Sequence, residues 1–358
     1  MIAFVYILFF TVLLVVFYRG WWIHLKKQVA ASKTYELTSI SVVIPFRNEV
    51  ANLPKLVESI SKLTKLPLEF IWVNDHSEDD SLVVLQNLPE NHRLISLSEN
   101  EFGKKSAIRQ GIQYAKGEFI LTWDADITVP TSYFEKLQTT PIADLHILPV
   151  RMVSNTLIES FYELDYYFLS SINIAVSAFA QPIVASGANL LFKKAAFQSL
   201  DSYPKHKNIA SGDDLFLLTD FKRAKKDIQT NTCSYLTVET ETPNSLNTFF
   251  QQRLRWIGKT SHINDQTTNA IGLLGFLYLT TFIYLLFTPH WFVVLVLKIV
   301  FDMLILLPYL HCLRRKKITW STPFFTLIYP VYFILIIGLN LIMNPQWKGR
   351  KKSMGMEY

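Results

Sequence analysis

Four long apolar segments constrain this chain more than any other feature of its sequence. They cover residues 1–18, Ala270–Pro289, a run that starts at Trp291, and Ile318–Trp347. A helix that crosses the hydrocarbon core of a membrane needs about 20 apolar residues. The sequence therefore predicts a membrane protein whose polar middle, residues 36–262, folds outside the bilayer.

Basic residues cluster beside these segments, in a chain whose formal net charge is +6. Lys26 and Lys27 follow the first segment, Arg314–Lys317 follow the third, and Lys348–Lys352 follow the fourth. Such clusters face the cytoplasm, and next to membrane segments they suit anionic lipid head groups better than nucleic acid. We therefore predict an integral protein of the bacterial cell membrane, with a cytoplasmic polar domain, membrane lipids as partners and no nucleic-acid partner.

The first apolar segment is expected to be an uncleaved anchor. It begins directly after Met1, lacks a charged region before it, and is followed by no small-x-small cleavage site. Cys233 and Cys312 lie far apart without CxxC spacing, so they suggest neither a disulfide framework nor a zinc site. The predicted organisation is an anchor over 1–25, a catalytic domain over 36–262, a membrane region of three segments over 268–347, and a basic tail over 348–358.

Two features inside the C-terminal membrane region need an explanation. Lys298 and Asp302 lie four residues apart on one helical face, and a structural ion pair is the interpretation that we favour. The run Ile318–Trp347 would be about 45 Å long as one helix, which exceeds the hydrocarbon core. We expect Pro323 and Pro330 to break it into a hairpin or a re-entrant pair, which would return the basic tail to the cytoplasm.

The polar middle alternates between apolar runs and amphipathic segments. Strands are expected over residues 40–45, 68–75, 92–98 and 117–126, and helices over 48–63, 79–88 and 105–115. This alternation predicts an α/β fold with a mostly parallel, Rossmann-like sheet whose two faces are covered by helices.

Polar residues follow the expected strands at their carboxyl ends, where parallel sheets bind ligands. Arg47 and Glu49 follow the first strand, Asp75 the second, and Asp124 and Asp126 the fourth. Two carboxylates one residue apart repel each other unless a cation lies between them. Mg²⁺ or Mn²⁺ fits, because hard cations take oxygen ligands and share them with substrate phosphates. The alternative is a solvated acidic turn; no glycine-rich phosphate loop is present.

Six motifs together resemble a known family. In order, they are SVVIPFRNEVANL, VNDHSEDDS, GKKSAIRQG, WDAD, SGDDLFL and QQRLRW. Their order and spacing resemble the family 2 glycosyltransferases of the GT-A fold, over about residues 40–258. The membrane segments match the broad architecture of integral-membrane members of that family.

The resemblance implies a role for each matching residue on the donor side. Pro45, Arg47 and Glu49 would lie where the first strand meets the nucleotide. Asp75 would hydrogen-bond the base, and Lys104 would lie near the nucleoside. The aspartates of WDAD would be the family's DxD motif, which holds the sugar donor and the metal ion, with Asp126 as the direct ligand beside Asp124.

The remaining motifs imply the catalytic base and the phosphate-binding side. Asp214 would be the general base that takes the acceptor proton, although Asp213 and Asp214 could instead cap the following helix. The QxxRW residues Gln252, Arg255 and Trp256 would meet the diphosphate and the acceptor region. Arg253 and Arg255 could also form a basic face that touches lipid. A single displacement would invert the anomeric centre.

The sequence also departs from the family pattern. Asn74 replaces the first acid of the usual pair, Trp123 replaces an aliphatic residue, and Lys193 stands where arginine is common. His76 and His206 are expected to be ordinary loop histidines.

The predicted function is an inverting, metal-dependent glycosyltransferase. It would move a sugar from a nucleotide-diphosphate sugar, most often a UDP-sugar in this family, to a lipid, lipid-linked or glycan acceptor at the cytoplasmic membrane face. Two alternatives stay open. One is a processive polysaccharide synthase, for which the C-terminal segments are few. The other is a non-catalytic scaffold, which would be marked by the loss of Asp126, Asp214 or Arg255.

Overall fold

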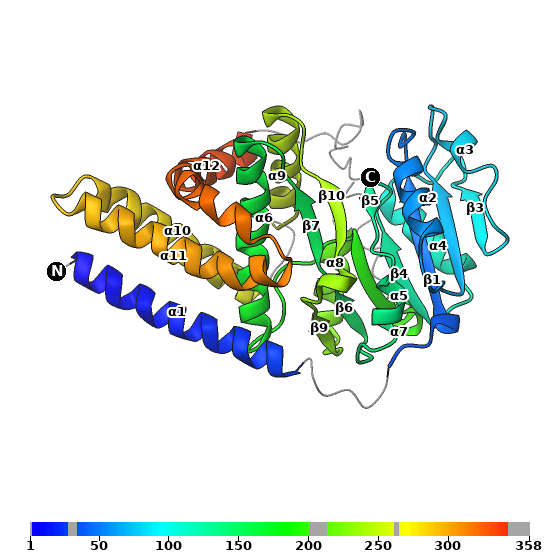
Figure 1. Ribbon diagram of the computed structural model, residues 1–358, viewed down its shortest axis with the longest axis horizontal. Helices are drawn as coiled ribbons and strands as arrows, with labels where there is room; N and C mark the ends of the chain where they lie inside the picture. Colours follow the sequence, from blue (N-terminus) through cyan, green and yellow to red (C-terminus); the bar gives the residue numbers. More distant parts are fainter. Residues whose placement is uncertain (1, 28–33, 201–212, 261–264, 343–358) are drawn as a thin grey trace, which may run out of the picture. The chain divides into compact units, whose positions relative to one another are not determined.

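A computed structural model of the protein describes residues 2–27, 34–200, 213–260 and 265–342, which form two compact units (Figure 1). The sheet unit contains residues 34–153, 185–200 and 213–241, and the helical unit contains residues 2–27, 154–184, 242–260 and 265–342. Residues 154–184 and 242–260 belong to the helical unit, although they lie within the range 36–262. The domain boundaries drawn from the sequence stay a prediction.

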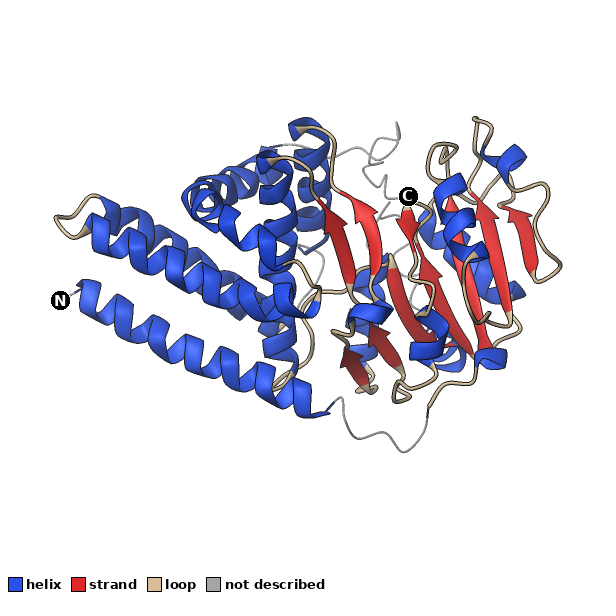
Figure 2. Ribbon diagram, viewed as in Figure 1, coloured by secondary structure: helices blue, strands red, loops and turns tan. Residues whose placement is uncertain are grey.

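The sheet unit is built on a seven-stranded sheet of order β3-β2-β1-β4-β8-β6-β9 and a three-stranded sheet of order β5-β10-β7 (Figure 2). In the larger sheet β8 runs antiparallel to β4 and β6, and all other pairs are parallel. The strands are β1 (Ile40–Phe46), β2 (Glu69–Asn74), β3 (His92–Ser96), β4 (Phe119–Trp123), β5 (Ile127–Thr128), β6 (Leu145–Ile147), β7 (Val150–Val153), β8 (Asn189–Lys193), β9 (Ile228–Thr230) and β10 (Val238–Glu241). The predicted α/β fold with a mostly parallel sheet is confirmed.

Helices cover this sheet and connect its strands. They are α2 (Leu53–Ser61), α3 (Ser81–Val84), α4 (Lys104–Tyr114), α5 (Tyr133–Leu137), α7 (Lys194–Leu200) and α8 (Asp213–Arg223), with short 3₁₀ turns η1 (Leu37–Ser39) and η3 (Ser234–Leu236). The helix expected over 79–88 is only one turn long. Few of its residues are buried, so little packing supports a longer helix.

Strand β1 lies at the centre of the larger sheet, and all seven of its residues are buried. On one face, Val43 packs in a core with residues of α4, α7 and α8. On the other face, Trp123 of β4 contacts Phe70, Tyr133 and Phe134, with ring centroids 5.3–6.1 Å apart. Burial on both faces explains the continuous apolar runs of these parallel strands, and the aromatic layer explains why a tryptophan stands at position 123.

The amino ends of β1, β2 and β4 are joined by buried polar contacts. The Ser41 hydroxyl donates to Oε1 of Glu69 (2.7 Å) and accepts from the amide of Gly117 (2.9 Å). A Cβ atom at Gly117 would lie 2.7 Å from the carbonyl oxygen of Ser39 and from the amide nitrogen of Ser41. Position 117 therefore requires glycine, because backbone atoms occupy the space of any side chain.

The helical unit contains six helices in the part of the chain that the structure describes. They are α1 (Ile2–Lys27), α6 (Leu157–Ser177), α9 (Leu246–Thr260), α10 (Gln266–Leu286), α11 (Trp291–Cys312) and α12 (Thr322–Ile342), with the 3₁₀ turn η4 (Lys316–Ser321) before α12. Four stretches are long and apolar enough to cross a membrane: Phe4–Lys27, Gln266–Leu286, Trp291–Cys312 and Lys316–Asn340. The chain is a membrane protein by this criterion.

Helix α12 corrects one expectation. We expected a hairpin broken at Pro323 and Pro330, but α12 continues through Pro330 as one helix. Pro323 lies in the first turn, where its missing N–H costs nothing, and apolar membrane helices tolerate an internal proline. In Figure 1, α1, α10 and α11 run side by side, whereas α12 is seen nearly end-on. Helix α12 therefore runs across the direction of the other three.

The expected pair inside the membrane region is formed. Lys298 Nζ lies 2.6 Å from Oδ2 of Asp302, and both side chains are fully buried. Thr326 of α12 donates to the same carboxylate oxygen (2.7 Å), and the Lys298 ammonium lies 4.8 Å from the ring centre of Tyr278 in α10. This pair links α10, α11 and α12, which supports a structural role.

Replacing Gly117 by alanine should destabilise the protein by about 1–3 kcal/mol, because backbone atoms must shift to admit the new methyl group. Thermal unfolding of the detergent-purified chain would measure this. Lys116→Ala is the matched control, since the neighbouring Lys116 is exposed and uses only its backbone amide, which donates to Glu69 (2.6 Å). Equal melting temperatures for Gly117→Ala and the wild type would contradict the close approach.

Two histidines of the sheet unit, one buried and one half-buried, should make the protein less stable in acid. Burial lowers the pKa of His146 and of His92 to about 4. His146 Nε2 donates to the Pro141 carbonyl (2.8 Å), and His92 Nδ1 accepts from Trp72 (3.0 Å), so both rings are neutral. An unfolded histidine has a pKa near 6.5. Between pH 6.5 and pH 4, each of these histidines should therefore lower the free energy of unfolding by about 1.4 kcal/mol for every unit by which the pH falls.

Unfolding measured between pH 4 and 7.5 would test this expectation. Below pH 6.5, the free energy of unfolding should fall less steeply with pH in His146→Gln than in the wild type, by up to the contribution of one bound proton. Above pH 6.5, the two slopes should be the same. The exposed His290 provides the control substitution His290→Gln, which should leave the slope unchanged. Parallel curves for wild type and His146→Gln would show that His146 is not buried in its neutral form.

Candidate active site

The candidate site lies at the carboxyl ends of three neighbouring strands in the sheet unit. Strand β1 pairs in parallel with β2 and with β4, and Phe46 lies opposite Asn74. The polar residues that follow these strands therefore meet at one edge of the sheet, as expected. On this edge, Arg47 and Glu49 come from β1, Asp75 from β2, and Asp124 and Asp126 from β4.

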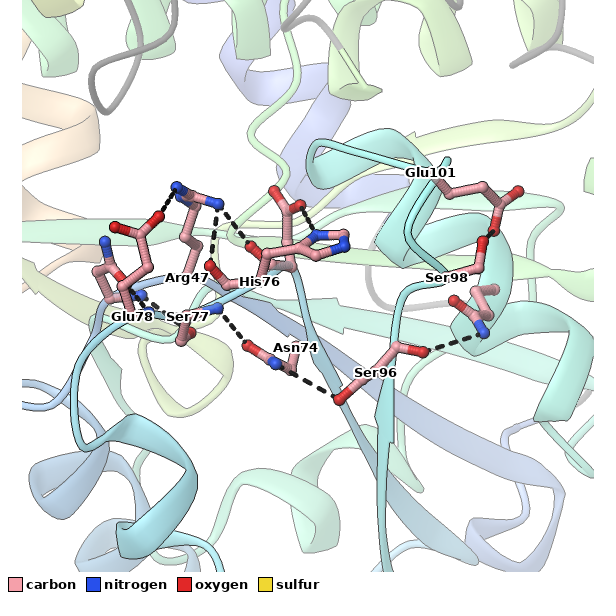
Figure 3. Close-up of polar contacts among 11 residues, drawn as sticks. Arg47, Asn74, His76, Ser77, Glu78, Ser96, Ser98 and Glu101 are labelled. Carbon is pink, nitrogen blue, oxygen red and sulfur yellow. Dashed lines mark hydrogen bonds and ion pairs between the residues drawn. The ribbon is translucent and has the colours of Figure 1, made fainter.

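Arg47 holds the loop that follows β2 (Figure 3). Its Nη1 atom donates to the carbonyls of Asp75 (3.1 Å) and His76 (3.0 Å), and its Nη2 atom donates to Oε1 of Glu78 (2.8 Å). The Arg47 side chain is nearly buried, while that of Glu78 is exposed. The guanidinium group thus positions the loop that carries Asp75, a role that the sequence did not indicate.

Further contacts join the loops after β1 and β2. The side-chain oxygen of Asn48 accepts from the amide of Glu78 (2.8 Å), and the side-chain oxygen of Asn74 accepts from the amide of Ser77 (2.9 Å). Asn48 and His76 both have positive φ, 52° and 55°, which is uncommon for residues with a side chain. The side chains of Asn48 and Asn74 therefore help to hold the loop after β2 in place.

An aromatic pair stands beside Asp75. The rings of His76 and Phe102 are stacked, with centroids 4.6 Å apart, and His76 Nδ1 lies 3.3 Å from Oδ1 of Asp75. Phe102 is 52% exposed and precedes Gly103, whose φ of 90° favours glycine. A flat exposed surface next to a buried carboxylate is suited to a planar ligand. The interpretation of His76 as an ordinary loop residue overlooked this pair.

The two aspartates after β4 have different surroundings. Lys104, the first residue of α4, places Nζ 2.5 Å from Oδ1 of Asp124. The pKa of Asp126 is raised to about 7, first by desolvation, then by the charges of Asp124 and Glu49, while Lys104 opposes the shift. Because the Asp126 side chain is exposed, we give more weight to the two like charges than to desolvation.

These carboxylates fit a divalent cation that also binds substrate phosphates. Glu49, Asp124 and Asp126 place three negative charges near one another, and the positive charge of Lys104 opposes their effect on the pKa of Asp126. No group of three or more His, Cys, Asp or Glu side chains in metal-binding positions occurs among the described residues. Mg²⁺ is commonly held by one or two carboxylates together with phosphates, and Asp126 and Asp124 can supply those two.

Asp214 lies in the first turn of α8, which packs in the same core as α4. Lys105 of α4 places its ammonium 4.4 Å from the ring centre of Phe216, two residues after Asp214. Asp214 Oδ1 accepts from the amide of Leu215 (2.7 Å), so it also contributes to the start of the helix. Ser211 and Gly212, the first residues of the SGDD motif, and His206 lie outside the described residues.

Comparison with known proteins shows what this region is similar to. Residues 41–200 match the model of the family described as Glycosyl transferase family 2. A mannosyltransferase from Pyrobaculum calidifontis, solved in complex with GDP-Man and Mn²⁺, superposes with a TM-score of 0.58 over 95% of this chain and 98% of its own. Its sequence identity is 16%, so this likeness shows the GT-A fold alone.

Curated relatives match a shorter segment. The undecaprenyl-phosphate 4-deoxy-4-formamido-L-arabinose transferase of Yersinia enterocolitica is 37% identical over 112 residues, which is 30% of this chain and 34% of the relative. The protein of the same name from Proteus mirabilis is 35% identical over 114 residues, covering 30% and 35%. The match therefore spans about a third of the length of these relatives.

The QxxRW residues lie outside residues 41–200, which match the family model, on α9 of the helical unit. Arg253 lies between Gln252 and Arg255 in the sequence. Its side chain is buried and forms an ion pair with Asp165 of α6. Its guanidinium carbon lies over the Trp256 ring, 4.1 Å from the ring centre. Arg253 also donates to Gln252 Oε1 (2.5 Å). Arg253 therefore anchors α9, and the expectation that it touches lipid is wrong because its charge is neutralised inside the unit.

The structure thus brings together most of the predicted donor-side residues. Arg47, Glu49, Asp75, Lys104, Asp124 and Asp126 lie at one edge of the larger sheet, and Pro45 lies within the buried strand that leads to them. Asp214 begins a helix that packs on the same sheet. Gln252, Arg255 and Trp256 belong to the other unit, and their part in phosphate binding stays a prediction.

Proposed function

We propose that the protein is an inverting, metal-dependent glycosyltransferase that uses a nucleotide-diphosphate sugar. The observation that supports this most is the group of Glu49, Asp124 and Asp126 beside Lys104, at the carboxyl ends of β1 and β4 in a glycosyl transferase family 2 domain. Three carboxylates close together, two of which raise the pKa of the third, Asp126, are suited to a donor that brings both a cation and phosphates.

Each donor-side group has a distinct task in this proposal. Asp75 would accept hydrogen bonds from the nucleobase, and the His76–Phe102 pair would offer its flat surface. Lys104 would orient Asp124 and lie beside the donor. Mg²⁺ or Mn²⁺, held by Asp126 with Asp124, would neutralise charge on the diphosphate leaving group. UDP is the nucleotide that we favour.

Asp214 would act as general base. It would take the proton of the acceptor oxygen as that oxygen attacks the anomeric carbon, on the face opposite the diphosphate. The bond to the acceptor forms while the bond to the phosphate oxygen breaks, which inverts the anomeric centre without a covalent enzyme intermediate. Arg255 would stabilise the leaving diphosphate through its planar, permanently charged guanidinium group.

We further propose a lipid phosphate as acceptor. The relatives from Yersinia enterocolitica and Proteus mirabilis are named for undecaprenyl phosphate, and this chain has four apolar stretches long enough to cross a membrane. A polyprenyl phosphate would keep its chain in the bilayer and expose its phosphate at the surface. The matched relatives favour this acceptor over the growing polymer of a polysaccharide synthase.

The arrangement of the helical unit supports a cytoplasmic catalytic face. The basic residues that end α1 and those that follow α11 lie at the same end of the α1, α10 and α11 group (Figure 1). Positive charge of this kind faces the cytoplasm. With α12 running across these three helices, we propose that the chain crosses the membrane three times and that the basic tail also stays in the cytoplasm.

Two substitutions should separate donor binding from proton removal. Asp126→Asn should weaken binding of nucleotide sugar with Mn²⁺ at least about tenfold, because a charged ligand is lost. Asp214→Asn should bind donor nearly as well as the wild type, yet lose transfer by about 10²–10⁴-fold. Calorimetric titration with a panel of nucleotide sugars would measure binding, and mass spectrometry of the lipid product from undecaprenyl phosphate would measure transfer.

Asp227→Asn is the matched control. Asp227 is exposed and precedes β9, at the opposite edge of the sheet from the site, so both readouts should stay at the wild-type level. Sugar transfer at the wild-type level by Asp214→Asn would contradict the assignment of Asp214 as the general base. Unchanged Mn²⁺-dependent donor binding by Asp126→Asn, or a wild-type protein inert toward every nucleotide sugar, would remove the proposed chemistry.

The three-crossing topology predicts which positions a reagent can reach from outside the cell. In a background with Cys233 and Cys312 replaced by serine, a cysteine at His290, between α10 and α11, should react with a membrane-impermeant maleimide on intact cells. A cysteine at Ser353 in the basic tail should react only after permeabilisation. Labelling of Ser353→Cys on intact cells would show a fourth crossing instead.

A further inference from the structure

We propose that the helical unit contains a binding site for the phosphomonoester head group of an anionic membrane lipid. The site is a recess of 430 Å³ lined by His311, Arg314, Arg315, Lys316 and Lys317. This proposal concerns a second site, apart from the donor site of the sheet unit, and it does not depend on the proposed transfer reaction.

The chain path creates the recess. Helix α11 ends at Cys312, and Arg314 then adopts a positive φ of 58°. The following residues form the turn η4, which leads into α12. Because the backbone reverses over so few residues, five basic side chains from seven consecutive positions line one volume. A straight helix would spread the same residues around its circumference.

One wall of the recess is fixed. Arg315 Nε donates to Oε1 of Glu163 in α6 (2.8 Å), and its Nη2 atom donates to Oε2 of the same carboxylate (2.7 Å). Nη2 also donates to the Ser154 hydroxyl (3.3 Å). The hydrogen bonds that Arg315 donates to the Glu163 carboxylate raise the pKa of Arg315. A two-point ion pair of this kind holds the guanidinium plane in place.

Positive charge remains in excess after this pairing. Glu163 neutralises one cation, while Lys316 and Lys317 add two more positive charges and are exposed to solvent. His311, also exposed, contributes a further donor. A phosphomonoester carries close to two negative charges near pH 7 and three acceptor oxygens, whereas a phosphodiester carries one. The number of converging cations therefore favours the monoester.

The location points to a lipid rather than a soluble phosphate. The recess joins Trp291–Cys312 to Lys316–Asn340, two stretches apolar enough to cross or enter a membrane. Trp320, in the same turn, is 90% exposed, and exposed tryptophans are enriched at the membrane–water interface. A head group in the recess would thus lie at the depth of lipid phosphates. The role of positive charge in setting membrane topology would explain why basic residues lie here. It would not explain why their side chains converge around an arginine that is held in place.

Native mass spectrometry of the full chain in detergent would test the site. Phosphatidic acid is the monoester probe, phosphatidylglycerol the diester, phosphatidylcholine the neutral head group, and inorganic phosphate the soluble competitor. The wild type should bind phosphatidic acid most tightly. Lys316→Gln/Lys317→Gln should weaken that binding by about tenfold or more. Arg314→Gln alone should weaken it by a smaller factor, which covers the case in which the double variant is unstable.

Lys26→Gln/Lys27→Gln is the matched control, since it removes the same charge from the end of α1, outside the recess. It should change phosphatidic acid binding less than twofold. Equal losses in the control and the recess variants would overturn the proposal in favour of diffuse surface charge. Equal binding of phosphatidylcholine would also overturn it. Displacement of phosphatidic acid by inorganic phosphate at comparable concentration would show a soluble-phosphate site instead. Each variant's Mn²⁺-dependent donor binding reports separately on the donor site.

Discussion

The parallel pairing of β1 with β2 on one side and β4 on the other is the constraint on which the candidate site depends. It places the residues after all three strands at one edge, with Phe46 opposite Asn74. At the other edge, Ser41, Glu69 and the backbone around Gly117 fix how far these strands can slide. A slip of one residue would turn each buried side chain to the other face and would move Asp75 away from the aspartates after β4.

Much of this arrangement could be predicted from the sequence, because it follows from local pattern. Continuous apolar runs gave the buried strands, and polar residues directly after them gave the edge where ligands bind. The identity of the charge beside Asp124 was less accessible. Lys104 follows a loop whose turn at Gly103 brings the start of α4 to β4, and no spacing in the sequence shows that distance.

The parts that could not be predicted depend on tertiary partners far apart in the chain. Arg253 and Arg255 look alike in the sequence, yet burial against Asp165 makes Arg253 an internal anchor. The same holds for Arg47, whose donors are used by backbone carbonyls of the loop after β2. Pro330 was expected to interrupt a helix, but a proline in an apolar setting removes one hydrogen bond without ending the helix.

The Lys298–Asp302 pair has a consequence for how the membrane region is made. Because both residues lie on α11, one turn apart, this segment carries its own counter-ion when it leaves the translocon. It can partition into lipid as an electrically neutral unit before α12 is synthesised, although a lone lysine near the bilayer centre would cost about 2.5–3.5 kcal/mol on insertion scales. When α12 packs against α11, Thr326 adds a hydrogen bond to an ion pair that already exists. Assembly of the helices therefore does not depend on α12 to neutralise an unpaired charge.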